Sequence, residues 1–88
     1  MSTQSRSEKK VRELLDRYGE IPSQVRDYVC SYLDAGENEL ALDMLGDYIV
    51  DNDFPASRAL IDDMAKVYGV MGVENPRNIA YLKEQARK

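Results

Sequence analysis

The segment from Gly36 to Pro55 predicts one helix enclosed by a glycine stop and a proline turn. Its apolar side chains recur at spacings that gather them on a single stripe of an α-helix: Leu40, Ala41, Met44, Leu45, Tyr48 and Ile49. A stripe of this width must pack against a core. We therefore expect a central helix here, joined to the preceding helix by a very short link, with Asn38 as its cap.

Four carboxylates occupy a neighbouring face of this helix at intervals of four residues, and we call them the acidic stripe: Glu39, Asp43, Asp47 and Asp51. No lysine or arginine is interleaved with them. Like charges at this spacing cost roughly 0.2–0.5 kcal/mol per pair, so helix stability does not explain the stripe. A cationic partner would explain it; the alternative is a solvated face that keeps the protein soluble. Because Asp43 and Asp47 lie off the apolar stripe, we expect both to be replaceable without disturbing the core.

Gly46 interrupts the interior of the same helix, where glycine costs about 1 kcal/mol relative to alanine. A glycine in this position is typical of a close approach by another part of the structure. A neighbouring helix or a bound partner could make that approach. Leu42, Ile49 and Val50 widen the apolar surface and favour the neighbouring helix.

Three more amphipathic segments accompany this helix, and each is followed by a glycine stop. They run from Ser7 to Tyr18, from Pro22 to Ala35 and from Ser57 to Met71. Asn75-Pro76 opens a further segment with a thin apolar stripe of Ile79 and Leu82. The expected fold class is all-α, a compact bundle of four amphipathic helices with a candidate short fifth helix at the C-terminus. We expect residues 1–6 to be a flexible N-terminus and residues 7–88 a single helical domain.

The chain lacks the residue types that most catalytic and metal sites need. It has no histidine, a single cysteine, Cys30, and no glycine-rich phosphate loop. Asp51 and Asp53 resemble the start of a calcium loop, but the glycine and the closing glutamate of such a loop are missing. We expect no enzymatic activity, no cofactor and no metal.

The sequence also contains no candidate for membrane insertion or export. No apolar run approaches the roughly 20 residues of a membrane span, and the N-terminus has no apolar signal core. We therefore expect a cytoplasmic protein.

Charge is distributed very unevenly along the chain. Residues 1–19 carry a net charge of +2, residues 20–63 of −9 and residues 64–88 of +3. An acidic block of this size attracts basic surfaces and repels nucleic acid. We therefore expect a protein partner with a basic surface, and neither nucleic acid nor membrane as a direct partner.

The candidate contact residues are the acidic stripe, two further acids and one tyrosine: Glu39, Asp43, Asp47, Tyr48, Asp51, Asp53 and Asp63. Five tyrosines lie on or beside apolar stripes, which predicts core positions with hydroxyls at the rim: Tyr18, Tyr28, Tyr32, Tyr48 and Tyr68. Tyr48 shares its helix with the acidic stripe, and tyrosine is a common anchor at protein interfaces.

The order and spacing of features in residues 21–73 resemble those of the MafI-like family of small bacterial immunity proteins. These features are Pro22 opening a helix, Asp34-Ala35-Gly36-Glu37, Leu40-Ala41-Leu42 with Leu45, Asp53-x-Pro55-x-Ser57, and Met71-Gly72. The resemblance implies an all-helical antidote that binds a polymorphic toxin, often a nuclease, in the cytoplasm. It carries over no catalytic residues.

The charge pattern and the resemblance lead to the same expected function. Nucleases bind polyanions, so their clefts are basic, and an acidic helix face can occupy such a cleft in place of phosphates. We expect an immunity protein that neutralises a cognate toxin domain in this way. The alternative is a small helical regulatory or adaptor protein whose basic ends contact nucleic acid or another protein.

Overall fold

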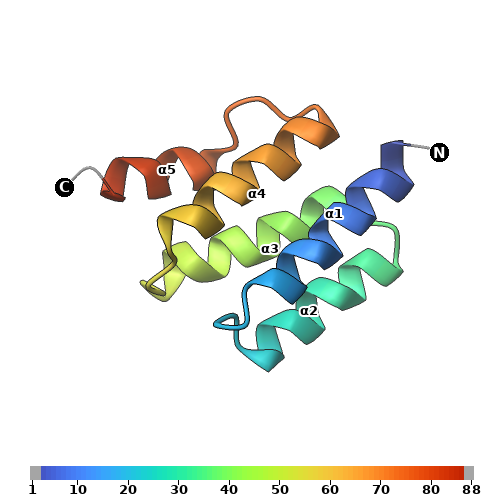
Figure 1. Ribbon diagram of the computed structural model, residues 1–88, viewed down its shortest axis with the longest axis horizontal. Coiled ribbons are helices and arrows are strands. Elements are labelled where there is room, and N and C mark those ends of the chain that lie inside the picture. The colour runs from blue at the N-terminus through green and yellow to red at the C-terminus, as the bar shows by residue number, and fades with distance from the viewer. Residues whose placement is uncertain (1–2, 87–88) are drawn as a thin grey trace.

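The computed structural model describes residues 3–86, and within that range the chain is all-α with five helices (Figure 1). They are α1 (Thr3–Arg17), α2 (Ser23–Asp34), α3 (Asn38–Asp51), α4 (Arg58–Met71) and α5 (Arg77–Ala86). The predicted fold class is confirmed, and the candidate fifth helix is a regular helix with Ile79 and Leu82 buried. Residues 1 and 2 of the predicted flexible N-terminus, and residues 87 and 88, lie outside the described residues.

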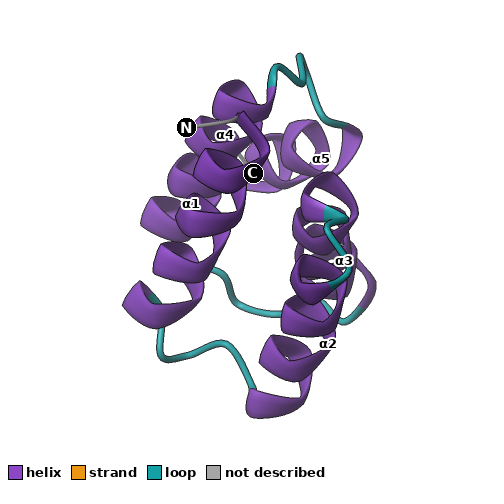
Figure 2. Cartoon of the chain, turned by 90° about the vertical axis from the view of Figure 1, so that its right-hand side faces the viewer, coloured by secondary structure: helices purple, strands orange, loops and turns teal. Residues whose placement is uncertain are grey.

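The helices form two layers around one core (Figure 2). α1 packs on α4 in one layer, α2 packs on α3 in the other, and α5 contacts both α3 and α4. The largest side chains with almost no exposed surface come from all of α1 to α4: Val11, Val29, Leu33, Leu42, Leu45, Ile49, Leu60, Met64 and Tyr68. Within residues 3–86, no helix combines the length and the hydropathy that crossing a membrane requires.

The first helix begins at Thr3, so the start that we predicted at Ser7 is wrong. Ser7 lies buried inside α1. Two hydrogen bonds tie the first turn to the α2–α3 connection: Gln4 Nε2 donates to the Gly36 carbonyl at 3.0 Å, and Asn38 Nδ2 donates to the Gln4 carbonyl at 2.8 Å. The prediction of Asn38 as the cap is therefore wrong: the N-cap residue of α3 is Glu37, and Asn38 links α3 to α1. Long-range contacts of this kind leave no periodic signal in the sequence.

The buried face of α3 is rotated relative to the predicted stripe. Leu40 is 42% exposed, whereas Leu42, which lies outside the predicted stripe, is fully buried. α5 packs on α3 at Gly46: a Cβ atom built on Gly46 would lie 2.0 Å from Asn78 Nδ2. The predicted close approach of a neighbouring helix is confirmed, and α5 is that helix.

The connections between helices are fixed by a few residues. Gly36 and Gly72 adopt the left-handed conformation with φ of +79° and +80°, as expected of glycine stops. Ser57 caps α4 by accepting a hydrogen bond from the Leu60 amide at 3.1 Å. The α1–α2 turn is held by Arg26, whose guanidinium donates to the carbonyls of Leu15, Tyr18 and Ile21. These three hydrogen bonds fix the position of α2 relative to α1.

Candidate interaction surface

A shallow groove of about 340 Å³ lies on the outer side of the α2–α3 layer. We call it the acidic groove, and its lining residues are Val25, Tyr28, Val29, Met44, Asp47, Tyr48 and Asp51. The four-residue spacing on each helix builds it, because residues at this spacing share one helix face. The groove therefore combines an apolar floor with two carboxylates of the acidic stripe.

Two tyrosines flank this groove in different ways. Tyr28 is 62% exposed, so the prediction of a core position for Tyr28 is wrong. Tyr48 is half-buried and its ring lies 5.8 Å from that of Phe54, in a tilted arrangement. A ring held in this way loses little conformational freedom when it binds a partner. Exposed and anchored aromatic side chains next to each other are typical of protein interfaces.

The carboxylates along the outer side of α3 repel one another. Glu39, Asp47 and Asp51 are exposed, and within residues 3–86 none of them forms an ion pair. The pKa of the Asp47 carboxyl lies above its ordinary value, because partial desolvation and the charges of Asp43 and Asp51 disfavour its ionised form. A positive group placed in the acidic groove would relieve this repulsion.

Asp43 has a structural role that its sequence position did not reveal. It is half-buried and accepts a hydrogen bond from the Tyr68 hydroxyl at 2.5 Å, while Asn78 Nδ2 donates to the same hydroxyl at 3.1 Å. Burial, together with the Asp43 carboxylate, raises the pKa of the Tyr68 hydroxyl far above its ordinary value. These two hydrogen bonds connect α3, α4 and α5. Our expectation that Asp43 can be replaced without disturbing the core is therefore wrong.

The two remaining candidate acids lie away from the acidic groove. Asp53 is exposed in the turn after α3, with φ of +48°. Asp63 belongs to the other layer, where it accepts hydrogen bonds from the Tyr18 hydroxyl at 2.5 Å and from Arg17 at 3.0 Å. The structure thus gathers Asp47, Tyr48 and Asp51 in one place and separates Asp63 from them.

Asp63 lines a second groove, of about 250 Å³, between α1 and α4. We call it the basic groove: Arg6, Lys10, Arg17 and Lys66 lie around an apolar floor of Leu14, Val67 and Val70, together with Glu13 and Asp63. It carries four positive and two negative side chains. The sequence did not reveal this groove, because its wall is formed by two helices, α1 with Arg6, Lys10 and Arg17 and α4 with Lys66, that are far apart in the chain.

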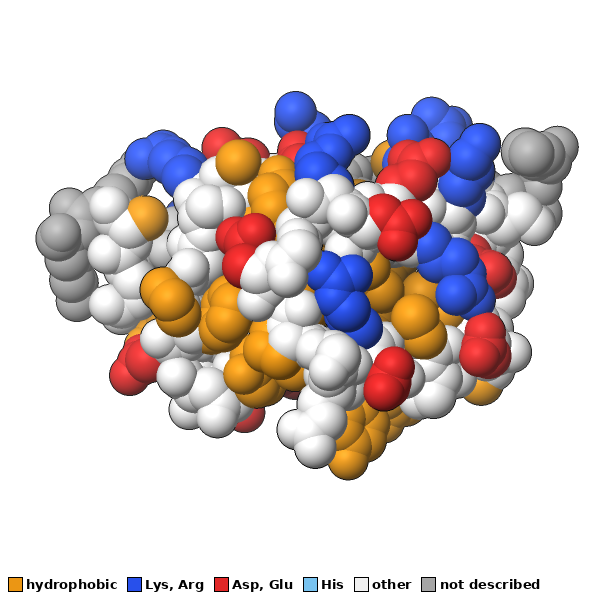
Figure 3. Space-filling view, turned by 60° about the horizontal axis from the view of Figure 1, so that its bottom comes forward, with side chains coloured by type: hydrophobic (Ala, Val, Ile, Leu, Met, Phe, Trp, Pro, Cys, Tyr) orange, Lys and Arg blue, Asp and Glu red, His pale blue; other side chains and the backbone are white. Residues whose placement is uncertain are grey.

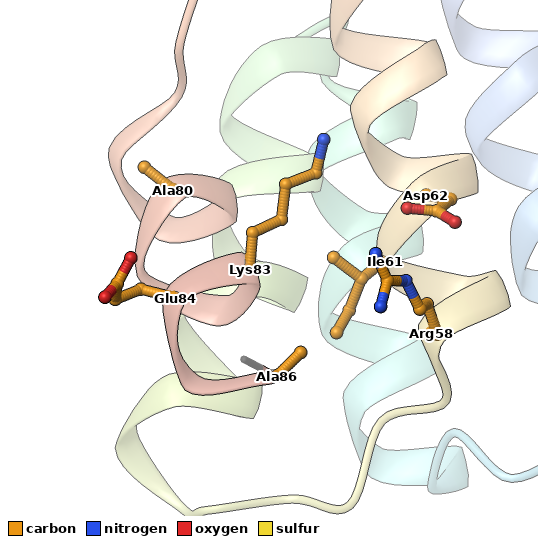
Figure 4. Close-up of a pocket in the computed structure, with 7 residues that line it drawn as sticks. All are labelled: Arg58, Ile61, Asp62, Ala80, Lys83, Glu84 and Ala86. Atoms are coloured by element: carbon orange, nitrogen blue, oxygen red, sulfur yellow. The ribbon is translucent and has the colours of Figure 1, made fainter. Parts of the chain in front are cut away.

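Elsewhere the surface charges are mixed. The face shown in Figure 3 has Lys and Arg side chains interspersed with Asp and Glu, around patches of hydrophobic side chains. A groove of about 420 Å³ between α4 and α5 is lined by two bases and two acids, Arg58, Lys83, Asp62 and Glu84. In Figure 4, Arg58 and Lys83 extend over the space between the helices, whereas Glu84 points away from it. The four charged residues of this lining, taken together, carry no net charge.

Replacing Tyr18 with phenylalanine should destabilise the fold more at neutral pH than in acid. The Tyr18 hydroxyl and then the Arg17 guanidinium hold the pKa of the Asp63 carboxyl below its ordinary value. Because this pKa is lower in the folded state, ionised Asp63 stabilises the fold above its unfolded pKa, and that contribution is lost as the pH falls through the folded value. We expect a loss of about 1.5–3 kcal/mol at pH 7 for a hydrogen bond to a charged group.

Urea unfolding of the Tyr18→Phe variant at neutral and at acidic pH measures this effect. The difference from the unmodified protein should shrink in acid, and Tyr81→Phe, which changes an exposed tyrosine on α5, should show no difference at either pH. An equal loss at both values would mean that the hydroxyl acts independently of Asp63 ionisation.

The chain matches no protein-family model, and comparisons with curated proteins and with solved structures gave no significant match. The resemblance to the MafI-like family therefore rests on the sequence features given above.

Proposed function

We propose that this protein is a binding protein that uses the acidic groove and the neighbouring acidic stripe to dock a basic surface of a partner protein. The observation that carries this proposal is that Asp47 and Asp51 line the same groove as the tyrosines Tyr28 and Tyr48. Within residues 3–86 neither carboxylate forms an ion pair. Carboxylates would pair with lysine or arginine of the partner, and the tyrosines would supply apolar contact and cation–π attraction.

The resemblance to MafI-like immunity proteins supports a specific partner. On that basis we propose a cognate toxin domain, a nuclease with a basic cleft, neutralised in the cytoplasm. The carboxylates of α3 would occupy positions that bind substrate phosphates, and the body of the bundle would exclude the nucleic acid. In this role the protein has no catalytic step of its own.

Co-expression with the cognate toxin domain tests the proposal. The protein should restore growth, co-purify with the toxin as a complex, and associate more slowly as salt is raised, because the attraction acts between exposed charges. Growth without a physical complex would favour the alternative of a small helical regulator. A complex whose association rate does not depend on salt would argue against docking through the carboxylates.

A further inference from the structure

The basic groove offers a second docking surface with its own chemistry. Within residues 3–86, Arg6 has no ion pair, while Lys10 pairs with Glu13 at 3.7 Å and Lys66 with Asp63 at 4.0 Å on the surface. Exposed pairs of this length contribute little to stability and exchange readily for other partners. The apolar floor of Leu14, Val67 and Val70 lies between these cations. The occupant that fits is a protein surface with an apolar knob flanked by carboxylates.

Nucleic acid fits this groove less well than a protein does. The carboxylates of Glu13 and Asp63 lie in the groove and would face any phosphate bound there. An apolar floor offers nothing to a phosphate backbone, and the chain as a whole carries a net charge of −4. These features favour a protein surface in which an apolar side chain is surrounded by carboxylates.

The acidic groove of the same protein presents such a surface. Tyr28 projects from α2 with 62% of its surface exposed, and Asp47 and Asp51 lie beside it. The two grooves belong to different layers, so one molecule cannot bring them together, but two molecules can (Figure 2). The two grooves are complementary because carboxylates of one can face cations of the other, and the Tyr28 ring of one can contact the apolar floor of the other.

We propose that the basic groove of one copy of this chain docks the Tyr28 side of the acidic groove of a second copy. The Tyr28 ring lies on Val70 of the other copy, the half-buried residue of its apolar floor, among its cations, and Asp47 and Asp51 face Arg6 and Lys10. The interface joins unlike surfaces, so copies add head to tail, and only the two end copies of such a chain of molecules keep a free groove. A basic partner would compete for the acidic groove and dissociate such chains.

Sedimentation velocity tests the proposal on the protein alone, at concentrations up to about 1 mM. In about 20 mM NaCl, where the Debye length is roughly 20 Å, the protein should sediment as a concentration-dependent mixture. In about 300 mM NaCl the association constant should fall at least about tenfold. Tyr28→Ala should abolish association, whereas Tyr81→Ala, at another exposed tyrosine, should leave it unchanged. A monomer under all conditions would overturn the proposal.

A mixing experiment tests whether the two grooves meet each other. Arg6→Glu with Lys10→Glu, both at exposed positions of α1, prevents the basic groove from binding carboxylates. Tyr28→Ala removes the apolar contact beside the acidic groove. Each variant alone should be monomeric, and their mixture should form a dimer that grows no further, because only one junction remains intact. Association of either variant alone would overturn the proposal. The Arg6→Glu, Lys10→Glu variant should still bind a basic partner, so loss of self-association and failure of the proposed function are separate results.

Discussion

Alanine at position 46 should destabilise the protein, whereas alanine at position 69 should stabilise it slightly. Both glycines lie inside helices, so alanine gains about 1 kcal/mol of helix propensity at each. At Gly46 the new Cβ meets Asn78 at Nδ2, Cγ and Cβ, the last at 3.2 Å, so turning the amide aside does not make enough room. At Gly69 nothing lies within 4 Å. We expect Gly46→Ala to cost about 1–3 kcal/mol and Gly69→Ala to gain about 0.5–1 kcal/mol.

Thermal unfolding of the two variants provides the comparison. In a domain of this size 1 kcal/mol shifts the melting temperature by roughly 4–8 °C, so the variants should differ by well over that amount. Adding Asn78→Ala to Gly46→Ala removes the two closest colliding atoms, Nδ2 and Cγ, and leaves only the Cβ contact at 3.2 Å. The double variant should therefore be more stable than the sum of the two single changes predicts. Equal effects at the two glycines would contradict the contact between α3 and α5.

Reversing the charges of Asp47 and Asp51 should abolish partner binding while the protein stays folded. Both are exposed, and unlike Asp43 neither is hydrogen-bonded to the interior within residues 3–86. Lysine at these positions breaks up like-charge pairs near the C-terminal end of α3, where positive charge is favourable. Against a basic cleft the same change places like charges together. Loss of a desolvated charge pair costs about 2–5 kcal/mol, a 30- to several-thousand-fold weakening.

The matched control is Asp16→Lys with Glu20→Lys, which alters net charge equally at exposed acids outside both grooves. It should change the salt dependence of association but leave the dissociation rate of the complex nearly unchanged. Melting temperature and affinity measured on the same samples separate folding from binding. Unchanged affinity in the folded Asp47→Lys, Asp51→Lys variant would mean that the acidic stripe is only a solvated face.

Helical periodicity predicted the elements of this fold because each apolar stripe is a local property of the chain. It could not fix how far each stripe is rotated toward the core. Leu40, a member of the predicted stripe, is exposed, whereas Leu42, which was expected only to widen the apolar surface, is fully buried, and the thin stripe of α5 gave no indication of where it would pack. The position of Gly46 did predict the contact with a neighbouring helix, because glycine inside a helix is less stable than alanine and is therefore typical of a close approach.

The candidate site was predictable only where its residues share one helix. Asp47, Tyr48 and Asp51 lie together because α3 places them there. Asp63 was grouped with them by the sign of its charge. It lies on α4, in the other layer, where it is hydrogen-bonded to Tyr18, a residue distant in the sequence. Tyr28 was missed as a surface residue because an apolar pattern does not distinguish a core position from the edge of a groove.

The pairing of α1 with α4 has a consequence for synthesis of the protein. The 54 residues from Tyr18 to Met71 must be added after α1 before this layer is complete, which at about 5–20 residues per second takes roughly 3–11 s. During that interval the apolar side chains of α1 that α4 will cover, such as Leu14, lack their final partner, whereas α2 and α3 can already close on each other. The apolar face of α1 that packs on α4 therefore stays exposed until α4 has been made.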